Sequence, residues 1–334
     1  MLRETLSQAR GGLEMSAFQQ LLAACEPELQ AATSREQFEP LLTKLATCLL
    51  TECEIVTQRA RYRIIEVEAY LHCPNHEDPF VHGAADQLTA CCWYFHKQKD
   101  TFKGGTYKGL DLTFGSAEAQ RKGGFIIRCL QQTDSKDFIE GPCLVVERLL
   151  RDYDEPDIAT YLRHHCGWRF RKPPPSAVTS SNDGFLLVSC QHGSQDSERK
   201  AKRAKVQVFA TPRVGLTLKR STPTSLHGEY IMASYRYCTE PRLKKGRTHT
   251  VMALLATGHE ARVVGALTGA NATRIRALQQ VLNGPAATED LAQLTDFATM
   301  FRRLHHPHYH KDAHSSCSDE PSDTEASLNG NEAC

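Results

Sequence analysis

Hydrophobic residues recur every three or four positions in two stretches near the start of the chain. They are Phe18, Leu21, Leu22 and Cys25 in the first stretch, and Phe38, Leu41, Leu42, Leu45 and Leu49 in the second. This spacing is typical of the buried face of an α-helix. Ser34 and Gln37 form the capping-box pattern at the start of the second stretch. The pattern therefore predicts two helices.

From Arg61 onward the period of the pattern changes to two. Alternate residues form two sets, Tyr62, Ile64, Glu66, Glu68 and Tyr70 in one, and Arg63, Ile65, Val67 and Ala69 in the other. A period of two is typical of a β-strand, because successive side chains of a strand point to opposite faces. We therefore expect one strand that carries both carboxylates on the same face as Tyr62 and Ile64.

Short apolar runs between Gly, Pro and polar residues predict further strands. These runs are 106–114, 124–130, 185–188, 206–209, 215–218 and 230–237. Helices are predicted at 144–150 and 157–164, and again beyond residue 250, where Asn271 and Thr288 are suitable N-caps. We expect an N-terminal helical lead, an α+β domain with a loop-rich insertion, a C-terminal helical extension and a disordered tail. The corresponding boundaries are 1–37, 38–250 with the insertion at 172–205, 251–305 and 306–334.

Composition narrows the class of protein. The chain has 334 residues, 40% of them hydrophobic and 24% charged, which suits one large globular domain or two small ones. No apolar run approaches the roughly 20 residues of a membrane span. Charged residues such as Arg3 and Glu4 interrupt the segment where a secretory signal needs an apolar block. We expect a soluble intracellular protein with no membrane partner, whose 13 cysteines are mostly reduced thiols.

Charge is distributed unevenly along the chain. Residues 58–250 carry 30 Lys and Arg against 21 Asp and Glu, whereas the segments before and after them each carry four more acidic than basic residues. An excess of Lys and Arg favours a polyanionic partner, because contacts with phosphates release condensed counterions. The basic middle of the chain is therefore compatible with nucleic-acid binding.

Glu68 and Arg128 are the charged residues that the pattern brings together. Arg128 ends an otherwise apolar run that begins at Phe125, and burial of an unpaired charge costs several kcal/mol. A Glu68–Arg128 pair across the sheet satisfies both groups. A plain ion pair without a catalytic role, or a surface arginine, is an equally good explanation at this point.

Five short motifs carry a resemblance to a known family. They are RIIEVEAY at 63–70, DPFVH at 78–82, GGFIIRCL at 123–130, RVG at 213–215 and YRY at 235–237. In this order they resemble motifs of the alkyladenine (3-methyladenine) DNA glycosylases, over about residues 38–250. The resemblance implies a single α+β domain with a curved, mainly antiparallel β-sheet and flanking helices, to which N- and C-terminal helical extensions are attached.

The resemblance also implies an activity, which is hydrolysis of the N-glycosidic bond of an alkylated or deaminated purine in double-stranded DNA. Such enzymes flip the damaged nucleotide out of the duplex before they act on it. Glu68 would be the general base for the attacking water, and Arg128 would position that water. Tyr70 and His82 would bind the flipped base. No metal or other cofactor is needed, and we expect a nuclear or cytoplasmic monomer.

The segment 104–115, where the family has a protruding hairpin, departs from the family pattern. Lys108 aligns with the residue that wedges into the DNA stack, and Tyr107 or Phe102 would take its place by a small change of register. Gly115 aligns with an asparagine of the family's base pocket. Two other functions therefore stay open, a nucleic-acid-binding relative that has lost or changed the hydrolysis, and an unrelated hydrolase that shares only the fold.

Two further groups of residues have alternative interpretations. Trp93, Tyr94, Phe95 and His96 either stack on bases or form a packed aromatic cluster, of which packing is the more common. His72, Cys73, His76 and His82 do not match a zinc-site spacing, so we predict a solvated loop there and no metal site.

Overall fold

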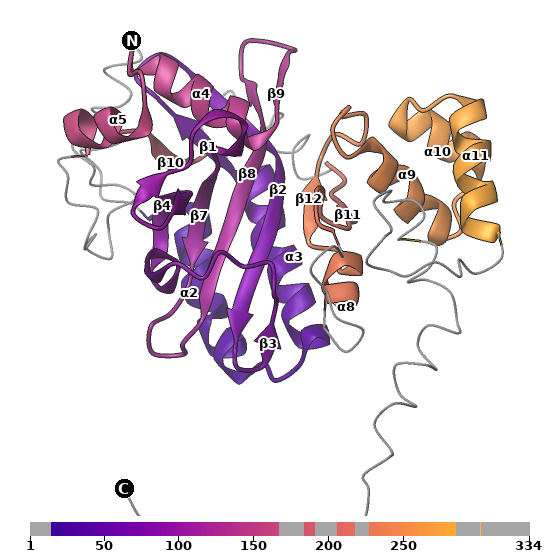
Figure 1. Cartoon of the computed structure of the whole chain (residues 1–334), viewed down its shortest axis with the longest axis horizontal. Helices are drawn as coiled ribbons and strands as arrows, with labels where there is room; N and C mark the ends of the chain where they lie inside the picture. Colours follow the sequence, from indigo (N-terminus) through magenta and orange to yellow (C-terminus); the bar gives the residue numbers. More distant parts are fainter. Residues whose placement is uncertain (1–14, 167–183, 191–205, 218–226, 285–300, 302–334) are drawn as a thin grey trace, which may run out of the picture.

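Two long antiparallel strands, β2 (Arg61–Cys73) and β8 (Lys122–Gln132), lie at the centre of the fold. The computed structural model of the chain describes residues 15–166, 184–190, 206–217, 227–284 and 301. Every strand pairing among these residues is antiparallel. The protein is therefore an α+β domain with a mainly antiparallel sheet and several helices (Figure 1).

The main sheet has the strand order β10-β1-β2-β8-β7-β4, and β3, β9, β11 and β12 pair at its margins. A separate small hairpin joins β5 and β6. The bounds of these strands are β1 Cys53–Val56, β3 His76–Glu77, β4 Ala90–Phe95, β5 Lys97–Gln98, β6 Thr101–Phe102, β7 Leu110–Phe114, β9 Phe138–Glu140, β10 Leu186–Ser189, β11 Phe209–Thr211 and β12 Arg236–Cys238.

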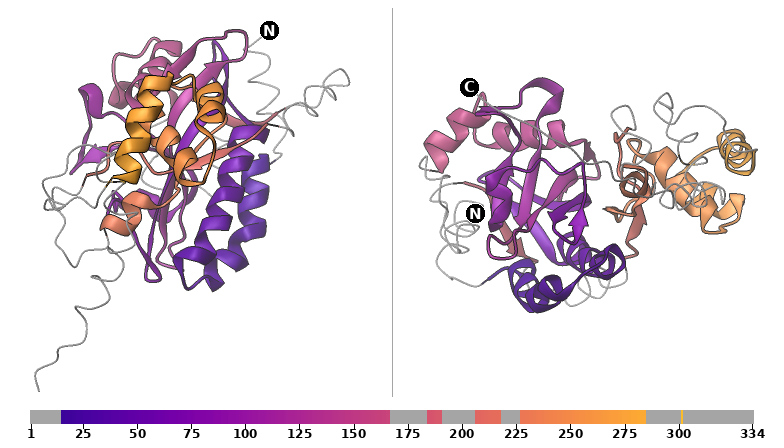
Figure 2. Two further views of the ribbon diagram at one scale, coloured as in Figure 1. Left: turned by 90° about the vertical axis from the view of Figure 1, so that its right-hand side faces the viewer. Right: turned by 60° about the horizontal axis from the view of Figure 1, so that its bottom comes forward.

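Helices α2 (Ala17–Ala31) and α3 (Arg35–Glu52) form a pair against the sheet, and α9, α10 and α11 form a second group beyond β11 and β12 (Figure 2). Ser16 and Gln19 make a complete capping box at the start of α2, which satisfies backbone N–H groups that have no partner within the helix. The other elements are α4 Pro142–Asp152, α5 Ile158–His165, α8 His227–Met232, α9 Arg247–Ala256, α10 Ala261–Thr268, α11 Ala272–Asn283 and two short 3₁₀ helices, η1 Ala85–Leu88 and η2 Gly105–Tyr107.

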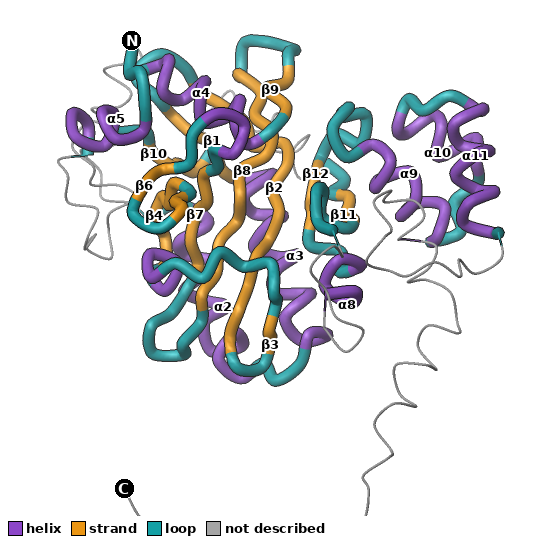
Figure 3. Tube along the Cα trace, viewed as in Figure 1, coloured by secondary structure: helices purple, strands orange, loops and turns teal. Residues whose placement is uncertain are grey.

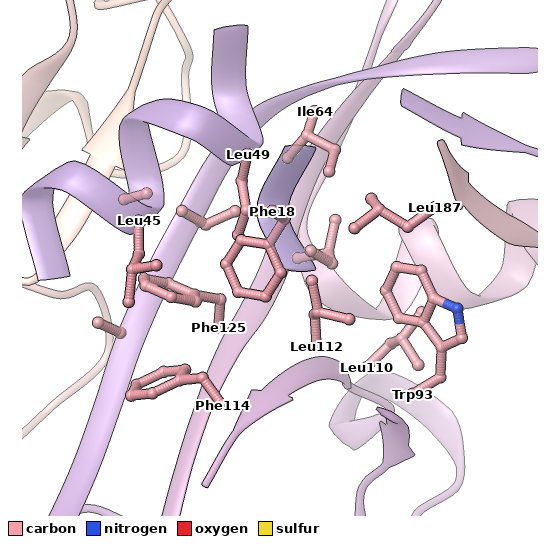
Figure 4. Close-up of a cluster of buried hydrophobic side chains, with 14 of the residues drawn as sticks. Phe18, Leu45, Leu49, Ile64, Trp93, Leu110, Leu112, Phe114, Phe125 and Leu187 are labelled. Carbon is pink, nitrogen blue, oxygen red and sulfur yellow. The ribbon is translucent and has the colours of Figure 1, made fainter. Parts of the chain in front are cut away.

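The main hydrophobic core lies between the α2–α3 pair and one face of the sheet. Phe18 and Phe125 meet there edge to face with ring centroids 6.2 Å apart, and Phe114 packs on Phe125 at 4.8 Å. Figure 4 shows how side chains from both helices and from several strands fill this space. The second core, which includes Val264 and Ile275, extends from α9, α10 and α11 to buried side chains of β2, β8, β11 and β12.

A double irregularity in the β2–β8 pairing corrects the prediction that Tyr62, Ile64, Glu66, Glu68 and Tyr70 share one face. Ile64 pairs with Leu130 and Val67 pairs with Ile127, so each strand has a shift of register between these pairs. Tyr62 and Ile64 consequently belong to the main core together with Val67, Ala69 and Leu71. Because a bulge redirects side chains, only Glu66, Glu68 and Tyr70 keep the face opposite this core.

Several predicted elements differ from those that form (Figure 3). The strand predicted over 230–237 is helix α8 followed by strand β12, and the strand predicted over 106–114 begins only at Leu110, after η2. The strand predicted over 206–209 forms later, as β11, and residues 215–217 form no strand. Apolar runs this short do not separate helix from strand by periodicity alone. Thr288, most of 172–205 and the tail 306–334 lie outside the described residues.

A search of the described helices found none that is both long and apolar enough to cross a membrane.

Removal of a core aromatic ring should destabilise the domain strongly. We expect Phe125→Ala to lower the free energy of unfolding by about 3–5 kcal/mol, because Phe125 is fully buried and its ring leaves a cavity. The matched control is Phe138→Ala, since the Phe138 side chain in β9 is 36% exposed, with an expected change within about 0.5 kcal/mol. Urea denaturation of both variants measures the difference, and equal losses would contradict this location of the core.

Candidate functional site

Glu68 is a fully buried carboxylate in the middle of β2. Its Oε2 accepts hydrogen bonds from Arg128 Nη1 at 3.2 Å and from the Tyr70 hydroxyl at 3.1 Å. Its Oε1 accepts the backbone N–H of Val214 at 2.7 Å. The pair of Glu68 and Arg128 expected from the sequence therefore forms. Each carboxylate oxygen can accept more than one bond, so the three protein donors do not use the full acceptor capacity of Glu68.

Glu66 joins this pair to a second arginine. Its Oε1 accepts hydrogen bonds from Arg128 Nε at 2.8 Å and from Arg236 Nε at 2.6 Å. Arg236 in β12 is 1% exposed and also donates to Thr211 and Thr250. Glu66 thus connects strands β2, β8 and β12 through charged hydrogen bonds. Arg128 bonds both carboxylates, whereas Arg236 bonds only that of Glu66.

Alternation along β8 places Arg128 on the face of these carboxylates. Phe125 and Ile127 point into the main core, so Arg128 projects from the opposite face. Leu130 also points into the main core, so one residue between Ile127 and Leu130 is additional to the alternation, and Arg128 has no directly paired residue in β2. The bulge thus returns the following residues of β8 to the core while the guanidinium stays opposite Glu66 and Glu68.

A third arginine forms a separate buried pair. Arg213 donates to both carboxylate oxygens of Asp78, at 2.6 and 3.2 Å, and both side chains are completely buried. The guanidinium also donates to the carbonyls of Ala69 and Tyr230, and it lies 4.4 Å from the centre of the Tyr70 ring. Arg213 therefore fixes both the loop that carries Asp78 and the position of the Tyr70 ring.

Strand register places the polar residues of this face in one row. Arg236 pairs with Glu68, Glu68 pairs with Ile126, Ile126 pairs with Asp111, and Asp111 pairs with Tyr94. Residues that are directly opposite one another in antiparallel strands project from the same face of a sheet. The row therefore crosses five strands and joins Glu68 to a second polar cluster at Asp111.

This second cluster contains His82. The His82 ring lies 4.6 Å from the His96 ring, and its nitrogens contact the Tyr94 hydroxyl at 3.3 Å and Lys103 Nζ at 2.7 Å. His96 Nε2 contacts Asp111 Oδ1 at 2.7 Å. Because Lys103 is a donor, His82 accepts with Nε2 and carries its proton on Nδ1. His82 is thus held by β4, β7 and the 96–109 segment.

The aromatic run at 93–96 is packed within the protein. Trp93 and Phe95 belong to the main core, where each packs against Phe185. Tyr94 and His96 point to the other face, beside His82, because a strand separates its alternate residues. Tyr94 is only 3% exposed, so packing accounts for Tyr94 as well as for Trp93 and Phe95.

Tyr107 and Lys108, two of the wedge candidates, differ in their surroundings. Tyr107 ends the short helix η2 and its side chain is 78% exposed. Lys108 Nζ instead pairs with Glu147 of α4 at 2.9 Å and is 19% exposed. Of the two side chains, that of Tyr107 is therefore the one exposed to solvent.

Gly115 has no room for a side chain. A Cβ atom there would lie 1.8 Å from the Gln87 carbonyl oxygen and 2.7 Å from the Arg121 carbonyl oxygen. An asparagine would not fit at this position without movement of the backbone. The glycine that aligns with the family's pocket asparagine is therefore a packing requirement of the loop that contains η1.

Burial and charge shift several pKa values in the two clusters. Burial lowers the pKa of Arg128, but the carboxylates of Glu68 and Glu66 outweigh it, and the net pKa is raised. Burial, followed by the charge of Glu68, raises the pKa of Tyr70. Burial, with His96 and Lys103 next, lowers the pKa of His82 to about 4. At neutral pH the site therefore contains a cationic Arg128, a neutral Tyr70 and a neutral His82.

Among the described residues, the structure brings together no group of three or more His, Cys, Asp or Glu side chains suited to a metal ion. His76, one of the residues weighed as a ligand, instead contacts the Leu71 carbonyl and the Tyr235 hydroxyl.

Comparison with known proteins does not identify a family. No family model matches the chain, and no solved structure matches it. One similar protein is the uncharacterized protein L759 of Acanthamoeba polyphaga mimivirus, which is 36% identical over 128 residues, 35% of this chain and 59% of the viral protein. The chain thus spans about three fifths of the length of that relative.

Sequence analysis did not assign roles to Glu66, Asp78, Asp111, Arg213 or Arg236. A charge on an apolar strand, such as Arg236 between two tyrosines, is a signal that could have identified the last of these. The contact of Glu68 with the Val214 N–H had no such signal, because a backbone donor is not visible in residue types.

Loss of one partner of the Asp78–Arg213 pair should be more damaging than loss of both. We expect Asp78→Leu to lower the free energy of unfolding by about 3–5 kcal/mol, because it leaves Arg213 buried without its carboxylate. In the double variant Asp78→Leu/Arg213→Met we expect a smaller loss. Urea denaturation of both variants tests this, and additive losses would show that the two groups are not coupled.

His82 should make stability depend on pH. The folded protein keeps His82 neutral down to about pH 4, whereas the unfolded chain takes up a proton near pH 6.5. Stability should therefore fall as the pH drops through this interval. We expect His82→Gln to reduce the loss of unfolding free energy between about pH 7 and about pH 5. Denaturation curves at both pH values provide the comparison.

Proposed function

We propose that the protein is a monofunctional DNA glycosylase that hydrolyses the N-glycosidic bond of alkylated or deaminated purines after flipping the nucleotide out of the duplex. The observation that carries this proposal is the fully buried carboxylate of Glu68, held by Arg128, Val214 and Tyr70. A carboxylate fixed in this manner suits general-base catalysis, because its position is set before the substrate binds.

In the proposed reaction, Glu68 accepts a proton from a water molecule as the water oxygen forms a bond to C1′ of the deoxyribose. The N-glycosidic bond breaks, and the base leaves with the bonding electrons. Arg128, which is 8% exposed and hydrogen-bonded to Glu68, orients the water and the neighbouring phosphate. The half-buried Tyr70 adjoins Glu68 on the same strand and provides a surface for the flipped base.

In this proposal the exposed His82 of the second cluster makes a further contact with the bound DNA. His82 and Tyr94 lie on the face that carries Glu68, at the far end of the row of paired residues. Neutral aromatic rings stack on bases of any sequence. Tyr107 on the exposed segment after β6 is the residue proposed to fill the space that the flipped nucleotide leaves.

The alternative is a relative that binds nucleic acid without hydrolysing it. Both oxygens of Glu68 already accept hydrogen bonds from the protein, which gives Glu68 a structural function that needs no catalysis. The two proposals differ in whether a charge-neutral, isosteric change at Glu68 removes base release.

Single-turnover base release separates these functions. Duplex oligonucleotides containing hypoxanthine, ethenoadenine or 3-methyladenine are incubated with wild-type protein or Glu68→Gln at low salt, where phosphate contacts are strongest. We expect release by the wild type and a decrease of at least about 100-fold in the variant, the usual size of a general-base contribution. Glu54→Gln, which alters a buried carboxylate on β1 that pairs with Arg61, is the control and should retain release.

Three outcomes decide the matter. Release that is unaffected by Glu68→Gln would contradict the assigned base. Absence of release with tight binding by both proteins would favour the non-catalytic alternative. Absence of both release and binding would exclude both DNA functions.

A further inference from the structure

The C-terminal helices form a unit in which a short helix, a tight turn and a longer helix follow one another. Helix α10 ends at Thr268, Gly269 adopts a left-handed conformation with φ of 66°, and α11 begins after the N-cap Asn271. Helix α9 packs against both, through the buried side chains of Val251, Val264 and Ile275. Two helices joined by a short glycine-containing turn, with a third helix packed against both, are features of helix-turn-helix DNA-binding units.

The turn between α10 and α11 is fixed by its own hydrogen bonds. Thr268 Oγ1 accepts the Ala270 N–H at 3.2 Å and donates to the Val264 carbonyl at 2.7 Å. Asn271 Oδ1 accepts the Arg274 N–H at 2.8 Å. The two helices also approach closely at Gly265, where a Cβ atom would lie 3.3 Å from Ile275 Cδ1. The orientation of α11 relative to α10 is therefore set by packing and by side-chain caps.

One face of α11 is buried, and the opposite face is exposed. Ile275 and Leu278 are each 2% exposed and point into the second core. At 3.6 residues per turn, the face opposite to them contains Thr273, Arg276, Ala277 and Gln280, all of which are exposed. This face combines small residues, which permit close approach of the helix backbone, with Arg276 and Gln280, each of which can form two hydrogen bonds to one base.

The segment of the chain that forms α9–α11 is basic. Residues 241–284 carry seven Lys and Arg and one acidic residue, Glu260. The other nine acidic residues beyond position 250 all lie after position 284, so the overall negative balance of the C-terminal segment conceals a basic helical unit. Arg274 Nη2 lies 3.4 Å from Thr248 Oγ1 at the start of α9, and Arg262 is exposed on α10. Such a charge excess complements the phosphates on both sides of a DNA groove.

We propose that α9–α11 bind the major groove of double-stranded DNA, with α11 as the helix that enters the groove. Arg276 and Gln280 contact base edges, since arginine suits guanine O6 and N7 and glutamine suits adenine N6 and N7. Arg262 and Arg274 contact the phosphates that flank the groove. This site is separate from the row of polar residues around Glu68, and it does not depend on the proposed hydrolysis.

The test is binding of the full-length protein to an undamaged, fluorescently labelled DNA duplex of about two helical turns, measured by anisotropy at several salt concentrations. We expect Arg276→Ala to weaken binding at least about fivefold and to reduce the dependence of affinity on salt. Lys44→Ala removes one exposed positive charge from α3 and serves as the matched control, with no expected change in affinity.

A second pair of variants tests the face without deleting a contact. Ala277→Glu and Ala277→Gln place side chains of equal size at the centre of the exposed face, and only the first adds a negative charge. We expect Ala277→Glu to weaken DNA binding at least about fivefold relative to Ala277→Gln. Circular dichroism and thermal unfolding verify that both variants fold, because position 277 is exposed.

Comparison of DNA with an RNA duplex tests whether α11 binds in the major groove. An RNA duplex of the same sequence should bind more weakly, because its major groove is too deep and narrow for a helix. The proposal would be overturned if the wild type did not bind undamaged DNA, or if Lys44→Ala weakened binding as much as Arg276→Ala. It would also be overturned if the two Ala277 variants bound DNA with equal affinity, or if RNA bound as tightly as DNA with the same sensitivity to Arg276→Ala. Glu68→Gln should bind this duplex like the wild type. Loss of base release and loss of duplex binding are therefore separate results.

Discussion

The structure depends on the burial of two carboxylates in the centre of its sheet. Glu66 is 2% exposed and Glu68 is fully buried, and an ionised carboxylate is stable in such surroundings only if it is paired and hydrogen-bonded. Arg128, Arg236 and the Val214 N–H supply these bonds from three separate parts of the chain. Strands β8 and β12 and the segment after β11 are consequently tied to β2 by charge as well as by backbone pairing.

The same requirement explains the irregular register between β2 and β8. In a regular ladder, the alternation that places Phe125 and Ile127 in the core would still place Arg128 on the face of Glu66 and Glu68. It would, however, turn Leu130 away from the core. The shifts at Ile64–Val67 and around Arg128 instead keep Ile64 and Leu130 in the main core while the charged side chains share the other face. A feature that looks like an imperfection of the sheet is thus what allows one strand to serve an apolar core and a polar site.

The polar face continues from this network toward β4, where it reaches the His82–Tyr94–His96 cluster beside Asp111. On the other side, the α9–α11 helices lie beyond β12 (Figure 1). In the combined proposal, helix α11 binds intact duplex while Glu68 acts on a flipped nucleotide. Separate sites for holding and for chemistry allow each to be tested independently.

The sequence by itself determined those features that arise from local patterning. Periodicity located α2, α3, β2 and β8, and the isolated charge at Arg128 predicted its pairing with Glu68, because an unpaired charge is not tolerated in an apolar strand. Tertiary structure decided the rest. The change of face within β2 arises from pairing with β8, the helix at 227–232 replaces a predicted strand, and Asp111 reaches His96 through a register that no single segment encodes. These features depend on contacts between residues far apart in the chain, which residue types and spacing along one segment do not specify.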